Sequence, residues 1–335
     1  MAEGSAPPRY IHPTGGKTMN ELQIWLNGAF VPKSKAQVSV FDHGLLYGDG
    51  IFEGIKSFDG KIFKLKEHID RFYESAHFLN IKLSHTRQQM AQIVLDSVAM
   101  NELHQGIAYV RLVATRGTGD LGINPRKCSN GATVFCIAST IALYPEEKYL
   151  HGIRCATVST RRNSVQSLPA RVKSLNYINN ILGIIEANLT GADEGIMLTM
   201  EGFLSEATVD NIFFVKNGVL KTPAPFLGIL EGVTRNSVMD ICRREGMPVE
   251  EGTYLTFDVY NADECWLTGT GADLVPVVEV DSRTIGSGKP GPVFKMIRSK
   301  WAAYIAEPAH HAVVPTKAEV KKRYAAAAKS VKAGA

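Results

Sequence analysis

The chain has 335 residues, of which 45% are apolar and 21% are charged, and this composition excludes a disordered protein. Its length allows one large domain or two of ordinary size. No apolar run approaches the roughly 18–20 residues that a membrane helix needs, and residues 1–18 lack the apolar stretch of a secretory signal. We therefore expect a protein without a membrane span.

Positive charge is concentrated at the C-terminus. The chain carries 37 Lys and Arg against 33 Asp and Glu, a net charge of +4. Residues 317–335 contain six Lys and Arg and one acid, Glu319, so the rest of the chain is nearly neutral. This balance gives no reason to expect a nucleic-acid partner. We expect residues 313–335 to form a basic, Ala/Lys-rich tail that is solvated and weakly helical.

The cysteines argue for a reducing compartment. The number of cysteines is odd, and no two of them form a C-x-x-C pair, which fits neither a disulfide framework nor a zinc ribbon. We therefore expect a cytoplasmic protein without a metal site. The five are Cys128, Cys136, Cys155, Cys242 and Cys265.

Hydrophobic periodicity predicts strands and helices in chain order. In the first half, strands are expected at 23–26, 29–31, 107–115 and 132–138, and helices at 65–79 and 86–103. In the second half, strands are expected at 153–159, 196–199, 211–215, 219–222 and 264–268, and helices at 177–189, 233–246 and 292–305.

This order predicts a two-domain α+β or α/β protein. Residues 1–20 are expected to be a flexible extension, and 21–142 a small N-terminal α/β domain. A polar break around Pro145 predicts a linker over 143–152, followed by a larger α/β domain over 153–312.

Four stretches of the second half suit chemistry on an anionic cofactor. Lys173 precedes a predicted helix of apolar residues, where a partly desolvated amine suits Schiff-base chemistry. Glu206 follows Ser205 between two predicted strands. The start of the 233–246 helix and the Thr-Gly-Thr-Gly turn at 268–271 both offer backbone N–H groups and hydroxyls to a phosphate. Taken singly, each stretch also has an ordinary explanation. Lys173 fits a surface lysine, Glu206 a solvated acid, the start of the 233–246 helix an N-cap, and residues 268–271 a tight turn.

Taken together, the order and spacing of these stretches resemble the fold-type IV pyridoxal-phosphate enzymes, the fold of D-amino acid aminotransferase. The closest resemblance is to branched-chain amino acid aminotransferases, from about residue 24 to 306. It implies that Lys173 is the catalytic residue and binds the cofactor, although Tyr177 follows it after four residues where several members have five. It further implies that Tyr177 binds the cofactor's phenolic oxygen and that Glu206 pairs with the pyridine nitrogen. The remaining cofactor ligands implied are Leu230 against the ring and Arg71, Val233, Thr234 and Thr270 on the phosphate.

The resemblance also implies a substrate pocket in the small domain. Tyr47 and Phe52 would line a pocket for an aliphatic side chain, with Gly54 leaving room. Tyr109 and Arg111 would help to hold the substrate's α-carboxylate or an acidic side chain. Backbone N–H groups near Thr270 and Gly271 would bind the α-carboxylate. Tyr47 and the loop 119–122 would reach across a dimer interface.

The activity that the resemblance implies is reversible amino-group transfer between L-Leu, L-Ile or L-Val and 2-oxoglutarate, by a ping-pong mechanism. The substrates would be small amino acids and 2-oxo acids, and the assembly a homodimer or a dimer-built hexamer. Three related activities stay open: a D-amino acid transaminase, an (R)-selective amine transaminase and a 4-amino-4-deoxychorismate lyase. Arg116 occupies a Thr-Arg-Gly segment like that of the D-specific enzymes, but no histidine follows two residues later. A non-enzymatic cofactor binder would be expected to lack Lys173 or Glu206.

Overall fold

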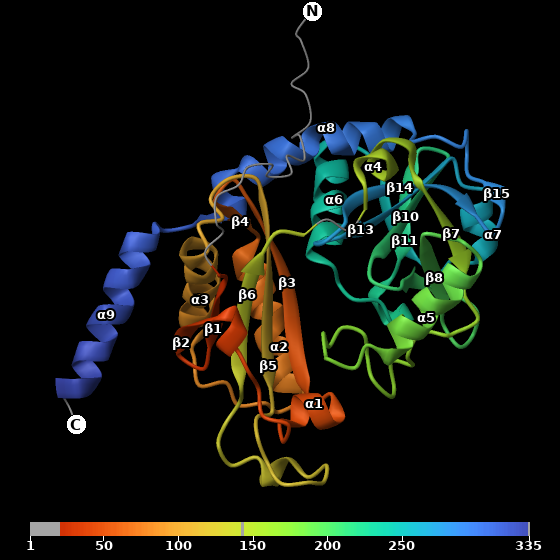
Figure 1. Ribbon diagram of the computed structural model, residues 1–335. Coiled ribbons are helices and arrows are strands. Elements are labelled where there is room, and N and C mark those ends of the chain that lie inside the picture. Colours follow the sequence, from red (N-terminus) through yellow and green to blue (C-terminus); the bar gives the residue numbers. More distant parts are fainter. Residues whose placement is uncertain (1–20, 142–143, 334–335) are drawn as a thin grey trace, which may run out of the picture. The chain divides into compact units, whose positions relative to one another are not determined.

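The computed structural model describes residues 21–141 and 144–333, which form two compact units (Figure 1). One unit spans residues 144–306, and the other combines residues 21–141 with 307–333. Each unit contains one sheet with helices, so the predicted two-domain mixture of helices and strands is confirmed. The predicted extension 1–20 and the first residue of the predicted linker, Leu143, lie outside the described residues.

The small unit is built on a seven-stranded sheet with the order β16-β4-β3-β5-β6-β1-β2. All of its strand pairs are antiparallel. The strands are β1 (Gln23–Leu26), β2 (Ala29–Pro32), β3 (Gly50–Phe58), β4 (Lys61–Phe63), β5 (Ile107–Thr115), β6 (Val134–Ser139) and β16 (His311–Val313).

Helices cover one face of this sheet, and the predicted substrate residues lie on the opposite face. Helices α2 (Leu65–Phe78) and α3 (Arg87–Met100) pack against β3, β5 and β6. Ile51 and Ile55 of β3 point into the core beneath them. Because side chains alternate along a strand, Phe52, Gly54 and their neighbours on β5 belong to the opposite face. A short helix, α1 (His43–Tyr47), precedes β3.

The large unit is built on a nine-stranded mixed sheet. The path is β12-β11-β10-β13-β14-β7-β8-β9, and β15 pairs with β14. The strands are β7 (Ile153–Thr157), β8 (Glu194–Leu198), β9 (Leu204–Ala207), β10 (Asn211–Lys216), β11 (Val219–Pro223), β12 (Val249–Gly252), β13 (Glu264–Gly269), β14 (Asp273–Val280) and β15 (Arg283–Thr284). The helices are α4 (Glu146–His151), α5 (Ile178–Leu189), α6 (Val233–Arg244), α7 (Thr256–Tyr260) and α8 (Pro292–Ala306). Strand β9 also contacts β10 and β11, so the sheet curls and gathers the ends of these strands.

Every strand and helix that the periodicity predicted is present, but two boundaries need correction. The predicted linker contains α4, which packs against β14 and buries Tyr149. Residues 307–312, expected in the large domain, belong to the small unit, because β16 pairs with β4 there.

The expected solvated tail is also corrected. Residues 317–333 form helix α9, which packs on α3 (Figure 1). Val320 is fully buried, Arg323 pairs with Asp96 at 3.0 Å, and the ring of Tyr324 meets Phe30 edge-on. Val320 and Tyr324 are four residues apart and therefore share one helix face. In the sequence, the surrounding Ala and Lys residues make this apolar face difficult to recognise.

Val320→Ala is therefore expected to lower the free energy of unfolding by about 1–3 kcal/mol, because it leaves a cavity under α9. Lys322→Ala, at an exposed position of the same helix, is the matched control and is expected to change stability by less than about 0.5 kcal/mol. Chemical denaturation of both variants measures the difference. Equal stabilities would show that α9 does not stabilise the small unit.

Candidate active site

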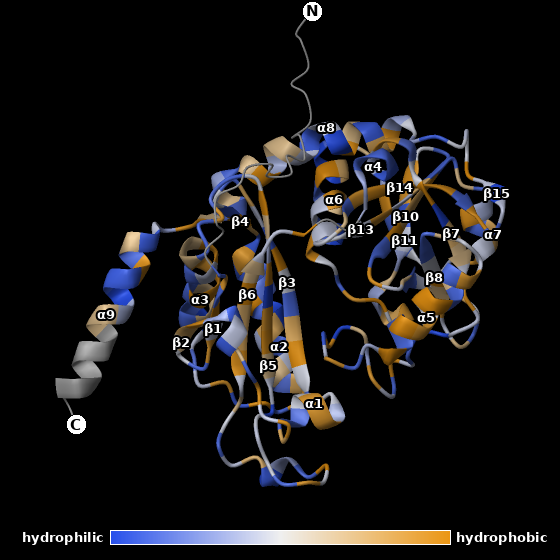
Figure 2. Cartoon of the chain, in the orientation of Figure 1, coloured by the Kyte–Doolittle hydropathy of each residue, from blue (hydrophilic) through white to orange (hydrophobic). Residues whose placement is uncertain are grey.

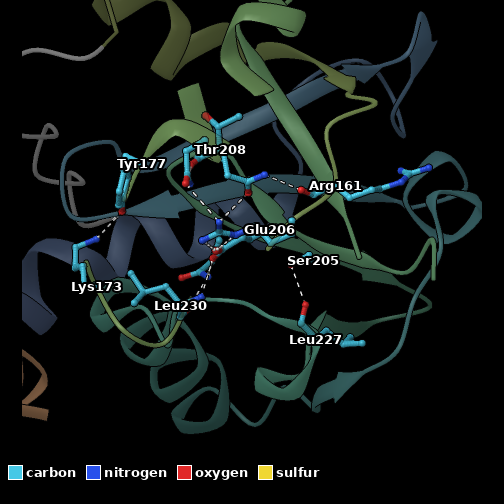
Figure 3. Close-up of polar contacts among 12 residues, drawn as sticks. Arg161, Lys173, Tyr177, Ser205, Glu206, Thr208, Leu227 and Leu230 are labelled. Atoms are coloured by element: carbon cyan, nitrogen blue, oxygen red, sulfur yellow. Dashed lines mark hydrogen bonds and ion pairs between the residues drawn. The ribbon is translucent and has the colours of Figure 1, made fainter. Parts of the chain in front are cut away.

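Lys173 and Tyr177 lie together at the entrance to α5. The lysine Nζ donates to the Tyr177 hydroxyl at 3.3 Å (Figure 3). Both side chains are half-buried, and the N–H of Asn176 donates to the Ser174 hydroxyl within the turn that joins them. The four-residue step between lysine and tyrosine thus still brings the amine beside the phenol.

Glu206 lies at the centre of a buried network in the large unit (Figure 3). Arg162 Nε and Nη2 each lie 3.0 Å from its Oε1. The N–H of Leu230 and the Nδ2 of Asn211 each donate to its Oε2 at 3.0 Å. Burial raises the pKa of Glu206, while the Arg162 guanidinium and the Leu230 N–H act in the opposite direction. The four donors favour the carboxylate form, which suits a partner for a protonated ring nitrogen.

Sequence reasoning missed Arg162 and Asn211. Arg162 lies outside the four stretches singled out from the sequence, and Asn211, five residues after Glu206, was given no role there. The only available signal was general: a buried glutamate needs a cation and hydrogen-bond donors nearby. Asn211 is also fixed by close packing, because a Cβ at Gly232 would lie only 2.1 Å from its Oδ1. The amide of Asn211 donates to the Leu230 carbonyl at 2.8 Å as well, so it joins Glu206 to the segment before α6.

Two backbone features near this network can receive an anion. Helix α6 begins after Gly232, and no side chain caps its first turn, which contains Val233 and Thr234. Uncapped N–H groups at a helix start favour negative charge. The second feature is the β13–β14 turn, which carries Thr270 and Gly271. Before that turn, Thr268 pairs with Asn211 across β13 and β10, and its buried hydroxyl has no hydrogen-bond partner in the described part of the chain.

The predicted substrate residues of the small unit form a row on β3 and β5. Arg111 lies opposite Gly54, and its guanidinium is 4.5 Å from the ring centre of Phe52. Its Nη2 donates to the Tyr109 hydroxyl at 3.2 Å. The space beside Gly54, expected to receive substrate, is taken up by Tyr109, because a Cβ there would lie 2.1 Å from the tyrosine hydroxyl.

Gly54→Ala is accordingly expected to displace Tyr109 and disturb Arg111, raising the KM for an acidic substrate roughly 10-fold, the factor that a lost hydrogen bond to a charged group produces. Steady-state kinetics measures this effect, with 2-oxoglutarate, the acceptor that the sequence resemblance implies, as the varied substrate. Gln88→Ala, which removes an exposed side chain of α3 in the same unit, is the control for folding. An unchanged KM would mean that the position of Tyr109 does not matter to acidic substrates.

Arg71, the predicted phosphate ligand, is held by a buried carboxylate in the small unit. Its Nε and Nη2 contact the two oxygens of Glu53 at 2.7 and 2.8 Å. His68 approaches the same carboxylate at 2.8 Å. Burial by itself would raise the pKa of Glu53, but Arg71 and His68 outweigh it and hold the pKa at about 2. The guanidinium of Arg71 is therefore fixed in direction, and the structure does not join it to the row on β3 and β5.

Tyr47 is the last residue of α1 and is hydrogen-bonded to the loop 119–122, which was expected to lie with it at a dimer interface. The N–H of Gly122 donates to the Tyr47 hydroxyl at 2.8 Å, so a hydrogen bond joins α1 to the loop 119–122. Arg116 has another role. Its Nε and Nη2 grip Asp49 at 2.8 and 2.9 Å, and the guanidinium also donates to the carbonyls of Leu79 and Asn80.

Other kinds of site find no support in the part of the chain that the structure describes. Within those residues, no group of three or more His, Cys, Asp and Glu side chains is arranged to hold a metal ion. None of the described helices combines the length and the apolar character needed to cross a bilayer.

Comparison with known proteins identifies the family. The class IV amino-transferase family matches residues 50–280. The chain is 50% identical over 287 residues to a putative branched-chain-amino-acid aminotransferase of Methanocaldococcus jannaschii, covering 84% of this chain and 98% of the relative. A D-alanine aminotransferase of Bacillus licheniformis is 32% identical over 281 residues, covering 83% and 95% of the two chains. The T.th. branched-chain amino acid aminotransferase, solved with pyridoxamine 5'-phosphate, superimposes with a TM-score of 0.83 at 34% identity, covering 89% and 100%.

The residues of the large unit fit such a cofactor. The buried carboxylate of Glu206 suits a pyridinium nitrogen, and the uncapped start of α6 suits a phosphate. The buried hydroxyl of Thr268 lies on the same sheet face as Asn211 and adds a polar group that has no hydrogen-bond partner among the described residues. The chain therefore belongs to the class IV aminotransferases of fold type IV, and it is a pyridoxal-phosphate-dependent transaminase of the branched-chain type.

Proposed function

We propose that the enzyme transfers amino groups reversibly between L-leucine, L-isoleucine or L-valine and 2-oxoglutarate. The observation that supports this most directly is the row of Phe52, Tyr109 and Arg111 on one sheet face. An aromatic ring beside a guanidinium offers apolar surface to a branched aliphatic side chain and charge to an acidic one. One pocket with both properties serves two unlike substrates in turn, which is the requirement of ping-pong kinetics.

The chain's own residues divide the chemical work. Pyridoxal phosphate, when bound, supplies a ring that accepts the electrons released at the substrate's Cα. The Nζ of Lys173 would take the proton from the substrate's Cα and deliver it to C4′ of the cofactor, with the Tyr177 hydroxyl holding the amine in place at 3.3 Å. Glu206 presents a carboxylate to the ring nitrogen. Arg71, Val233, Thr234 and Thr270 are proposed as phosphate ligands, Leu230 as the ring contact, and the N–H groups at Thr270 and Gly271 as the site of the substrate carboxylate.

The D-amino acid alternative is disfavoured by the surroundings of Arg116. Its guanidinium is already engaged by Asp49 and two backbone carbonyls, so it has little capacity left for a substrate carboxylate. The pairing of Tyr109 with Arg111 argues similarly against an amine transaminase, whose amino donors have no carboxylate to bind. The lyase would eliminate pyruvate, and a pocket lined by Tyr47 and Phe52 speaks against it.

Glutamate formation from 2-oxoglutarate tests the proposal, with L-leucine, L-isoleucine, L-valine, L-alanine and D-alanine as donors. We expect kcat/KM for L-leucine to exceed that for L-alanine by about 10²-fold, because an apolar pocket rewards the extra methylene and methyl groups. We also expect Arg111→Met to impair 2-oxoglutarate far more than L-leucine. A higher kcat/KM for D-alanine than for L-leucine would overturn the substrate assignment.

We further propose that the enzyme assembles as a homodimer or a dimer-built hexamer, in a reducing compartment such as the cytoplasm. The free state of all five cysteines supports the compartment. Exposed apolar side chains support the assembly. Along α5 they form a stripe, visible as a band of hydrophobic colour in Figure 2, of Ile178, Ile181, Leu182, Ile185 and Leu189. A second set surrounds α1 and the loop tied to it: Val40, Phe41, Leu45, Tyr47, Leu121 and Ile123. Contiguous exposed apolar surface of this kind is typical of an interface.

Subunit mixing tests whether Tyr47 acts across that interface. Lys173→Ala and Tyr47→Ala are each expected to have low activity alone. After random subunit exchange of an equal mixture, about half of the dimers are mixed, and one of the two sites in each has both residues intact. The mixture should therefore recover about a quarter of the wild-type activity. A mixture shown to contain mixed dimers but no more active than its components would place Tyr47 in the site of its own chain. A monomer by light scattering would contradict the assembly itself.

A further inference from the structure

Arg162 is a buried cation that spans two parts of the large unit. It lies in the segment after β7, where its backbone N–H donates to the Leu198 carbonyl at 2.8 Å. One side of its guanidinium binds Glu206 through Nε and Nη2. The other side, Nη1, lies 3.2 Å from the Oδ1 of Asn179 and 3.4 Å from that of Asn180. Both asparagines belong to the first turn of α5.

The asparagines are themselves anchored. Asn179 Nδ2 donates to the Arg161 carbonyl at 2.8 Å, and Asn180 Nδ2 donates to the Thr208 carbonyl just beyond β9 (Figure 3). Tyr177 directly precedes this turn, and Lys173 lies four residues before Tyr177. The segment that leads into α5 therefore carries Lys173 and Tyr177. The first turn of α5, which follows directly, is hydrogen-bonded to Arg162, the partner of Glu206.

We propose that Arg162 is a positioning residue that keeps Glu206 negatively charged and fixes it relative to the segment carrying Lys173 and Tyr177. Glu206 and Lys173 must act on opposite sides of one small cofactor, so an error in their separation is costly to the rate. A salt-bridged arginine with a third hydrogen-bonding arm is suited to this, because its planar guanidinium holds several partners in one geometry. Arg162 itself needs no contact with substrate or cofactor.

A purely structural ion pair is the competing explanation. Buried ion pairs are often replaceable by apolar side chains without loss of the fold. The two explanations differ in what happens to Glu206. If Arg162 only packs the interior, its removal alters stability and leaves the cofactor's electronic state unchanged. If it maintains the charge of Glu206, its removal should have the same consequence as removing that charge directly.

The test compares the visible absorbance of the bound cofactor, titrated with pH in the absence of substrate, for holoenzymes of the wild type and its variants. We expect Arg162→Gln, which retains donors but no charge, to reproduce the spectrum and pH midpoint of Glu206→Gln. Arg162→Lys, which retains the charge, should stay near the wild type. Arg161→Met is the matched control, since the neighbouring Arg161 side chain is exposed and only its carbonyl joins the network. A wild-type spectrum and pH midpoint for Arg162→Gln would overturn the proposal.

Two further readouts complete the test. The double variant Arg162→Gln/Glu206→Gln should be no slower than Glu206→Gln alone, because residues that act as a unit are not additive. Fully additive losses would contradict a shared role. Asn179→Ala should slow the reaction with an amino donor about 10-fold while leaving the absorbance spectrum intact, since it cuts the arm to α5 and not the charge contact. An unchanged rate would remove the positioning part. The inference rests on the proposed roles of Lys173 and Glu206, and the absorbance readout does not depend on which amino acid is the substrate.

Discussion

Replacing Lys173 by Ala is expected to lower turnover by about 10⁴-fold, the largest factor that a general base in proton transfer usually contributes. The amine of Lys173 contacts the Tyr177 hydroxyl at 3.3 Å, and its removal leaves the proposed proton transfer without its base. Turnover of L-leucine with 2-oxoglutarate, measured after saturation with pyridoxal phosphate, gives the effect. Small primary amines added to the variant should restore part of the rate, because they supply the missing base.

A matched control separates this role from a general loss of lysine. Lys295→Ala removes an exposed lysine of α8 in the same unit and should retain full turnover. Wild-type turnover by Lys173→Ala would show that Lys173 is not the catalytic base. The roles proposed for Tyr177 and Glu206 beside it would then lose their support.

The largest expected effect on stability comes from Glu53→Gln in the small unit. This change leaves Arg71 and His68 facing a neutral amide in the interior, and breaking a buried ion pair in this way costs about 3–5 kcal/mol. The side chain of Glu53 is fully buried, whereas that of Arg71 is 11% exposed, so solvent can compensate only slightly. Denaturant unfolding at pH 7 measures the change. Cofactor affinity should fall as well, since Glu53 aims the proposed phosphate ligand Arg71.

The pH dependence of stability has a definite sign. The pKa of Glu53 is about 2 in the folded protein against an ordinary value of 4.5. Its contribution is therefore fully present above about pH 4.5 and is lost as the pH falls toward 2. Glu53→Gln should lack that part of the acid slope. The exposed Glu67→Gln, on the helix that carries Arg71, is the control and should change stability by less than about 0.5 kcal/mol. If Glu53→Gln matched the wild type in stability and acid slope, Glu53 would not be what holds Arg71.

The secondary structure could largely be predicted where one physical pattern dominated. Ile107–Thr115 is a β-branched run and forms β5 with the same limits. Strand β3 was not predicted as a strand, because two glycines and the inward-facing Glu53 break its alternation. Strand β14 was not predicted because Pro276 interrupts its pattern, and α9 was not predicted to pack because its exposed positions have a low apolar content. In each of these cases tertiary contacts outweigh local preference.

The site shows the same division between motif and network. Lys173, Tyr177, Glu206 and Leu230 could be proposed because their spacing resembles a known family, and the structure brings them into two bonded groups. Arg162 could not be found in this way, since it meets Glu206 from 44 residues earlier in the chain. Asn211 follows Glu206 by only five residues, but its contact with the carboxylate depends on how β9 and β10 fold together. The closeness of the Tyr109 hydroxyl to Gly54 could not be predicted either, because it depends on packing across two strands. Contacts of that kind are a property of the folded chain.

The most direct test of the proposed function is a half-reaction scan of the purified holoenzyme. L-leucine, D-alanine and (R)-1-phenylethylamine are mixed with it separately, without an acceptor, and the conversion of the bound cofactor to its amino form is followed by absorbance. We predict rapid conversion with L-leucine and slow conversion with the other two, in accord with the Phe52–Tyr109–Arg111 row and the engaged Arg116. Faster conversion with D-alanine or with the amine would contradict the substrate pocket proposed for the small unit, while leaving Lys173 and Glu206 in place.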